Sequence, residues 1–177
     1  ESEPLIALAY EKNSESVQAQ IGCIGELVFL RSLLSGSTKS LEIVRGWQGF
    51  EKSLRDFQYG TTGIEVKANT TSSSRHHIQG VHQIEPGIIS NNQVETDLYL
   101  LSIGLIATIE DAENSFTLPE LVQTCIDHIS SIGAESQLAV EMLIEKVEKY
   151  LGGFGIPYRH LDAKNHANYT RRWQVTF

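Results

Sequence analysis

The stretch that decides the fold is Arg55-Asp-Phe-Gln-Tyr-Gly-Thr-Thr-Gly-Ile-Glu-Val-Lys-Ala68, where polar and apolar residues alternate on both sides of a glycine-flanked turn. This alternation predicts β-strands at residues 55–59 and 64–68. The residues between them, 60–63, predict a four-residue hairpin turn, since glycine accepts the backbone angles of tight turns. The stretch therefore predicts two adjacent antiparallel strands.

The predicted hairpin gathers charged side chains on one face. Pairing the last residue of the first strand with the first residue of the second places Asp56 opposite Lys67 and Gln58 opposite Glu65. Opposed side chains of an antiparallel pair point to the same side. Two carboxylates and one ammonium group are therefore expected close together.

This combination of side chains suits metal-assisted phosphodiester chemistry. Carboxylates are the protein ligands that Mg²⁺ prefers, and a bound cation polarises a phosphoryl oxygen and acidifies a water molecule. Lys67 would orient the attacking water or stabilise the charge that develops on the phosphate. A simpler interpretation is an exposed salt bridge between Asp56 and Lys67, which contributes about 0–1 kcal/mol.

Upstream of the hairpin, apolar residues recur at helical spacing from Gln18 to Leu34 and predict a helix. Gly22 and Gly25 inside it each cost about 1 kcal/mol relative to Ala, which indicates close approach of another backbone. Between this helix and the hairpin, residues 41–47 predict a further strand.

Downstream of the hairpin, Thr117 and Glu120 form a capping-box pattern that predicts the start of a helix. Further elements are expected: a short strand at 75–79, a long central strand at 97–109 with a bend at Gly104, a helix at 136–151, and one or two strands within 158–177. This order predicts an α/β or mixed α+β fold, with one central mixed sheet flanked by helices.

The chain is acidic overall, with 14 Lys and Arg, 22 Asp and Glu and a formal charge of −8, which weakly opposes nucleic-acid binding. The charges are segregated, however. Residues 76–145 contain eleven acids and no Lys or Arg, whereas residues 39–75 and 146–177 carry net charges of +2 and +4. The acidic block is explained equally well as a solvated face. The two basic segments predict a positive surface that would face DNA.

Length and composition bound the class of protein. A hydrophobic content of 41% over 177 residues predicts one globular domain, residues 1–177. The start at Glu1 without methionine leads us to expect a fragment of a longer chain that lacks its N-terminal residues. The longest uncharged apolar run, residues 98–109, is shorter than the about 20 residues of a membrane span, so no such span is expected. Two cysteines, too few for a disulfide framework, predict a reduced, cytoplasmic protein.

The spacing of the charged residues resembles a known signature. Asp56, followed after eight residues by Glu65-Val66-Lys67, resembles the Asp…(Asp/Glu)-x-Lys motif of the PD-(D/E)XK nuclease superfamily. The helical stretch Gly22–Leu27, with Glu26, resembles the first helix of that fold, whose Glu often helps to hold metal. Arg55 stands at the position of the proline in the superfamily's name.

The resemblance is most specific to the bacterial "PD-(D/E)XK motif protein" family, a restriction-endonuclease-like group encoded among phage-defence genes. It covers residues 22–153, and the matching segments are Arg55–Phe57, Ile64–Lys67, His77–Ile78, Gln83–Pro86, Leu98–Ser102 and Leu118–Val122. It implies a restriction-endonuclease-like αβββαβ core. It further implies a Mg²⁺-dependent endonuclease of double-stranded DNA in restriction or antiphage defence, with defence-system subunits or a second copy of the chain as protein partners.

The resemblance also implies individual roles. Asp56 and Glu65, with the carbonyl of Val66, would hold Mg²⁺, for which Mn²⁺ can substitute. Lys67 would position or activate the attacking water, and Glu26 would orient a metal-bound water or a second ion. The alternative for Glu26 is an ordinary exposed helix carboxylate.

Four other residues are expected to contact DNA or the groups around the metal: Gln58, Arg75, His77 and Gln83. For His77 the alternative is a structural, hydrogen-bonded histidine. The whole site also has an alternative, since a non-catalytic nuclease-like subunit used for assembly or DNA docking would share the fold. Metal binding without cleavage of any substrate would favour that second interpretation.

Overall fold

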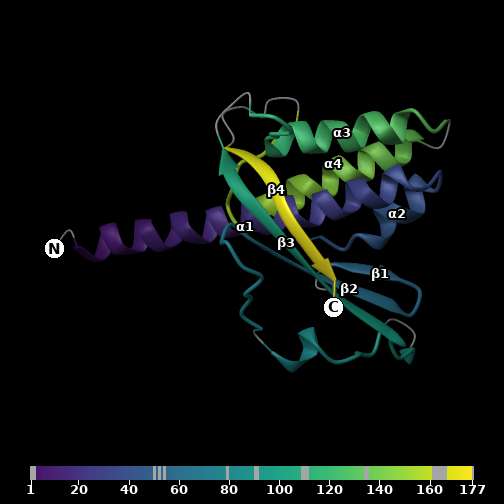
Figure 1. Cartoon of the computed structure of the whole chain (residues 1–177), viewed down its shortest axis with the longest axis horizontal. Helices are drawn as coiled ribbons and strands as arrows, with labels where there is room; N and C mark the ends of the chain where they lie inside the picture. The colour runs from purple at the N-terminus through teal and green to yellow at the C-terminus, as the bar shows by residue number, and fades with distance from the viewer. Residues whose placement is uncertain are drawn as a thin grey trace.

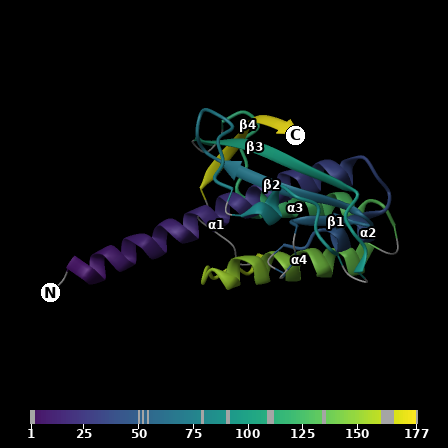
Figure 2. The same cartoon turned by 90° about the horizontal axis from the view of Figure 1, so that it is seen from below.

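The computed structural model describes residues 3–49, 51, 53, 55–78, 80–89, 92–108, 112–133, 136–160 and 167–176. Its elements are α1 (Glu3–Ser35), α2 (Ser40–Gly46), β1 (Phe57–Tyr59), β2 (Thr62–Asn69), the short 3₁₀ helix η1 (Val81–Gln83), β3 (Asp97–Thr108), α3 (Leu118–Ser130), α4 (Ser136–Gly153) and β4 (Asn168–Thr176). Figures 1 and 2 show a sheet with the long helices packed together on one side and the first turns of α1 extending beyond the body.

The sheet has the strand order β1-β2-β3-β4. Strands β1 and β2 are antiparallel, β2 and β3 are parallel, and β3 and β4 are antiparallel. The predicted α+β fold with a central mixed sheet is therefore confirmed, and it is consistent with a restriction-endonuclease-like core. One cluster of buried apolar residues joins the sheet to α1, α3 and α4.

The predicted hairpin exists, but its register and turn were predicted incorrectly. Phe57 pairs with Ile64 and Tyr59 with Thr62, so two residues, Gly60 and Thr61, make the turn. Gly60 has a φ of +59°, a conformation that glycine adopts without steric cost. This register, continued by one pair, places Asp56 opposite Glu65 rather than opposite Lys67.

Helix α1 approaches β2 closely at Gly25, as the sequence predicts. A Cβ atom built on Gly25 would lie 2.5 Å from the Cβ of Ala68 and 3.7 Å from its Cα. No side chain larger than hydrogen fits at residue 25 in this arrangement. At Gly22 the close neighbour is the hydroxyl of Tyr150, at 3.0 Å from such an atom, and not a backbone.

Two predicted strands are absent. Residues 41–47 form α2 and the residue after it, because Leu41 and Val44 are spaced to pack on one side of a helix and Val44 is fully buried. Residues 75–78 are irregular, since their segment is attached to β3 through side-chain hydrogen bonds instead of a strand ladder. Gln79, the last residue of that predicted strand, lies outside the described residues.

The other predicted elements are present. Strand β3 is long and central, and its register with β4 shifts between Gly104 and Leu105, where the bend was expected. Thr117 and Glu120 form the predicted capping box at the start of α3. The helix predicted at 136–151 extends two residues further, through both glycines.

Within the described residues, one helical stretch has the length and hydropathy of a membrane span, Glu15–Ser35 of α1. No membrane span was expected from the sequence. Of this stretch, 56% is buried inside the protein, and Leu27, Val28 and Leu30 are completely buried. Packing in the protein core therefore accounts for its apolar composition.

Candidate active site

Asp56 lies just before β1 and is held from two sides. The backbone N–H of Gln48 donates to its carbonyl oxygen at 2.8 Å. The backbone N–H of Val66 donates to Oδ2 of its carboxylate at 2.6 Å. The side chain therefore reaches across the hairpin onto β2, and the carboxylate lies beside the residue between Glu65 and Lys67.

Glu65 and Lys67 share one face of β2, as the alternation of the strand requires. The Nζ atom of Lys67 lies 2.7 Å from Oε1 of Glu65, and the side chains are 20% and 8% exposed. The predicted alternative, a salt bridge between Asp56 and Lys67, is not the one that forms. Instead, Lys67 pairs with the carboxylate two residues before it on the same strand.

The surroundings of Asp56 raise the proton affinity of its carboxylate. Burial raises the pKa of Asp56 to about 7, and the negative charge of Glu65 adds to the shift. The hydrogen bond from Val66 and the charge of Lys67 act in the opposite direction. Without a cation, the site therefore holds Asp56 partly protonated near neutral pH.

Glu26 comes from α1 and is 4% exposed, so the alternative of an exposed helix carboxylate is wrong. Its Oε2 accepts a hydrogen bond from Nε1 of Trp47 at 2.6 Å, and its Oε1 accepts one from the Tyr150 hydroxyl at 2.9 Å. Burial raises its pKa well above the usual range, and the charges of Asp56 and Glu65 raise it further. Glu26 is thus in electrostatic contact with the two hairpin carboxylates.

The donor set fits a hard cation that keeps much of its hydration. Across the described part of the chain, no group of three or more His, Cys, Asp or Glu side chains is arranged to hold a metal ion. Mg²⁺ does not need such a cage, because it is usually bound by one or two carboxylates, waters and substrate phosphates. Asp56, which is half-buried, and Glu65, which is buried, are two such carboxylates. A divalent cation would relieve the repulsion between them.

The four residues expected around the site lie in different places. The amide of Gln58 donates to the carbonyls of Gly60 and Thr62, so this side chain braces the turn and does not face Glu65. Arg75 and His77 are exposed on the segment that follows β2. Gln83 ends η1 and is half-buried.

A sequence model of the family described as "Putative PD-(D/E)XK family member" (DUF4420) matches residues 8–172. The chain belongs to this family. Searches of curated proteins and of solved structures found no match. Membership makes the chain a nuclease-like domain and bears out the predicted superfamily.

One buried ion pair of this PD-(D/E)XK family member, Arg55 with Glu95, was not predicted from the sequence. Both side chains are 0% exposed, and Nη2 of Arg55 lies 2.6 Å from Oε2 of Glu95. Arg55 also donates to the carbonyls of His82 and Glu85. The guanidinium thus joins the residue before Asp56 to the segment that precedes β3. Glu95 lies in a polar stretch of the sequence, so no local pattern indicated that it would be buried or paired with Arg55.

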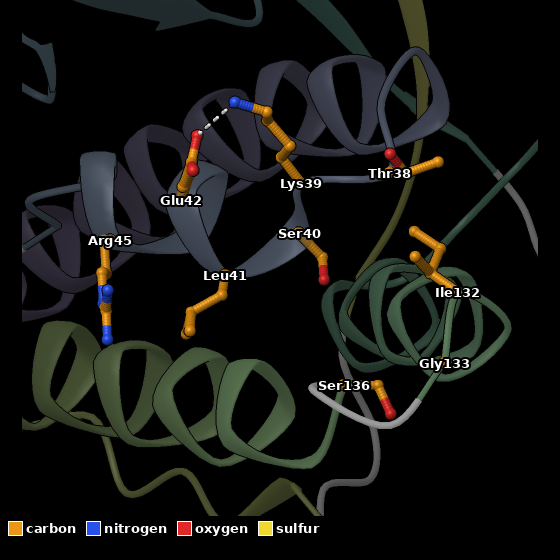
Figure 3. Close-up of a pocket in the computed structure, with 9 residues that line it drawn as sticks. All are labelled: Thr38, Lys39, Ser40, Leu41, Glu42, Arg45, Ile132, Gly133 and Ser136. Carbon is orange, nitrogen blue, oxygen red and sulfur yellow. Dashed lines mark hydrogen bonds and ion pairs between the residues drawn. The ribbon is translucent and has the colours of Figure 1, made fainter.

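The candidate site at Asp56, Glu65 and Lys67 is separate from the pocket shown in Figure 3. That pocket has a volume of about 490 Å³ and lies between the start of α2 and the turn from α3 to α4. Lys39 and Glu42 on its rim pair with each other at 3.3 Å. None of the predicted site residues lines it.

Proposed function

We propose that this domain is a Mg²⁺-dependent endodeoxyribonuclease that hydrolyses phosphodiester bonds of double-stranded DNA. The observation that carries the proposal is the meeting of Asp56 and Glu65 across the hairpin, with Lys67 bonded to Glu65. Two neighbouring carboxylates and one lysine on a hairpin are groups suited to metal-assisted hydrolysis of a phosphodiester. Membership of the PD-(D/E)XK family supports the same reaction.

The side chains divide the work as follows. Asp56, Glu65 and the carbonyl of Val66 would hold the cation, which supplies an acidified water and a polarised phosphoryl oxygen. Lys67 would hold the attacking water through its ammonium group and neutralise charge that develops on the phosphate. The hydrogen bond from Val66 already fixes the Asp56 carboxylate toward β2 before any ligand binds.

Glu26 has a positioning role in the proposal. Its two oxygens are oriented by Trp47 and Tyr150, which come from the segment after α2 and from α4. A carboxylate fixed in this way would orient a water near the hairpin acids. A carboxylate held only by mobile water molecules would not have the same fixed orientation.

The wider setting is proposed from the family resemblance. We place the domain in bacterial restriction or antiphage defence, with defence-system subunits or a second copy of the chain as protein partners. Cys23 and Cys125 are both buried and unpaired with each other, which suits the reducing cytoplasm that we propose for it.

The direct test is cleavage of supercoiled plasmid by the purified chain. Nicked and linear products are expected with Mg²⁺ or Mn²⁺ and none with EDTA, because the hairpin acids need the cation to act. The products are resolved on agarose gels over time. Binding of Mn²⁺ with no cleavage of duplex, single-stranded or modified DNA would instead favour a non-catalytic docking subunit.

The raised pKa of Asp56 predicts a pH dependence of metal binding. The folded state holds a proton on Asp56 up to about pH 7, whereas the unfolded chain releases it near pH 4. The metal-free protein should therefore lose stability as the pH rises through this window, because the folded state binds more protons there. Mg²⁺ binds the deprotonated carboxylate, so it should raise the melting temperature more at pH 8 than at pH 5.5.

Differential scanning fluorimetry with and without Mg²⁺ measures both effects. Asp56→Asn removes the titrating group and should remove most of the pH dependence of the metal-induced shift. A shift of equal size at both pH values in the parent protein would contradict the assignment of Asp56 as a ligand.

A further inference from the structure

The segment between β2 and η1 has the composition of a phosphate-binding surface. Residues 68–84 contain no Asp or Glu, although the whole chain is acidic. Residues 70–74 are all Thr or Ser, and Arg75 follows them directly. Arginine and hydroxyl side chains are the usual donors to phosphate oxygens in protein–DNA complexes.

Both ends of residues 70–76 are attached beside Lys67. The segment leaves β2 at Asn69, two residues after Lys67. It returns to the sheet at Ser102, which is the β3 neighbour of Lys67 in the parallel register. The fully buried Ser102 hydroxyl bonds to the hydroxyl of Ser74 at 2.7 Å and to Nε2 of His76. The segment is therefore fixed next to the proposed catalytic lysine.

Hydrogen bonds within the segment also hold its shape. The amide of Asn69 donates to the carbonyls of Ser73 and Arg75, at 3.4 and 3.2 Å. The hydroxyl of Thr71 donates to the carbonyl of Ser73 at 2.8 Å. A loop that is preorganised in this way loses little conformational entropy on binding a ligand.

The attachment turns the basic side chains outward. Ser74 and His76 bond to Ser102, whereas the side chains of Arg75 and His77 are exposed. Among the residues that the structure describes, no carboxylate forms an ion pair with Arg75. Burial and the charge of Lys67 lower the pKa of His76, so the imidazole adds no charge to the site at neutral pH. Arg75 is therefore an exposed cation on a segment that is attached to the sheet next to Lys67.

We propose that residues 70–77 form a contact surface for the DNA backbone, in which Arg75 binds a phosphate next to the scissile one and Ser102 positions the segment. This inference rests on the proposed function, since DNA is the substrate there. Ser102 is a positioning residue, because it is buried and acts through Ser74 and His76. The exposed hydroxyls of residues 70–73 complete the donor set.

Binding of a fluorescein-labelled 20-bp duplex, followed by anisotropy in EDTA over a series of salt concentrations, tests the proposal without cleavage. Arg75→Gln should weaken binding about tenfold and reduce the slope of log Kd against log salt by about 1, because one phosphate contact is lost. Arg75→Lys should retain most of the slope. The matched control is Arg159→Gln. Arg159 belongs to the second basic segment, but its charge is already paired with Glu148 at 2.8 Å, so this change should alter the affinity less than twofold.

Ser102→Ala should weaken binding about threefold and keep the slope, because the cation remains but its segment is less fixed. If Ser102→Ala does not fold, Ser74→Ala replaces it, since Ser74 is exposed; the same weakening of binding with an unchanged slope is expected. Equal losses for Arg75→Gln and Arg159→Gln would overturn the contact surface and leave the proposed nuclease function standing. Absence of any duplex binding by the parent chain would overturn both. If Asp56 variants lose cleavage but bind the duplex normally, the result supports Asp56 in the reaction and a DNA contact surface that does not depend on it.

Discussion

Replacing Asp56 with Asn, or Lys67 with Ala, is expected to lower the rate of plasmid cleavage by about 10³-fold. Asp56→Asn keeps the shape of the side chain and the capacity to accept the bond from Val66. It removes the negative charge that would hold the cation. Lys67→Ala removes the ammonium group that is 2.7 Å from Glu65. Each change therefore removes one part of the proposed chemistry and leaves the strands in place.

The two variants should differ in metal binding. Asp56→Asn should weaken the binding of Mn²⁺, measured by calorimetry, whereas Lys67→Ala should leave it equal or tighter, because a competing cation is gone. Matched controls are Asp127→Asn on α3 and Lys149→Ala on α4, which change exposed residues of the same types. Folded Asp56 and Lys67 variants that cut plasmid as fast as the controls would show that the reaction uses other residues.

The second large effect is expected at the buried ion pair. Glu95→Ala should lower the free energy of unfolding by about 3–5 kcal/mol, because it leaves the Arg55 guanidinium buried without its counter-charge. The same change removes the acceptor of the Gly87 N–H, at 2.8 Å. Since Arg55 immediately precedes Asp56, we also expect a loss of cleavage that exceeds the loss of folded protein.

Urea unfolding followed by circular dichroism measures this prediction. Arg55→Met combined with Glu95→Leu should recover part of the stability, since two apolar side chains leave no buried charge. The control is Glu42→Ala, whose pairing with Lys39 is exposed and contributes little. A Glu95→Ala protein as stable as the Glu42→Ala protein would mean that water reaches Arg55.

The hairpin shows which information its sequence carries and which it lacks. The alternation of residues 55–68 predicts the strands and their polar faces correctly. It cannot distinguish the predicted register from the observed one, because the two differ by two residues and every side chain stays on its own face. The length of the turn decides between them, and Gly60-Thr61-Thr-Gly63 suits a two-residue or a four-residue turn equally well.

Contacts distant in sequence explain the other differences. Residues 41–47 contain Leu, Ile and Val, which suit either a strand or a helix, and packing of α2 on α4 selects the helix. Glu95 lies 40 residues from Arg55, so no local pattern connects them. Glu26 was predicted as a site residue by resemblance, but its hydrogen-bond donors, Trp47 and Tyr150, became evident only from the fold.

The contact of Gly25 with Ala68 has a consequence for the geometry of the acids. Because only the methyl group of Ala68 separates α1 from β2 there, the distance between Glu26 and the hairpin carboxylates is set almost directly by the two backbones. A larger residue at either position would act as a spacer and move one acid away from the others. Among members of the family, residues 25 and 68 should therefore covary in size. The spacing of the acids is encoded by two residues that have no reactive group.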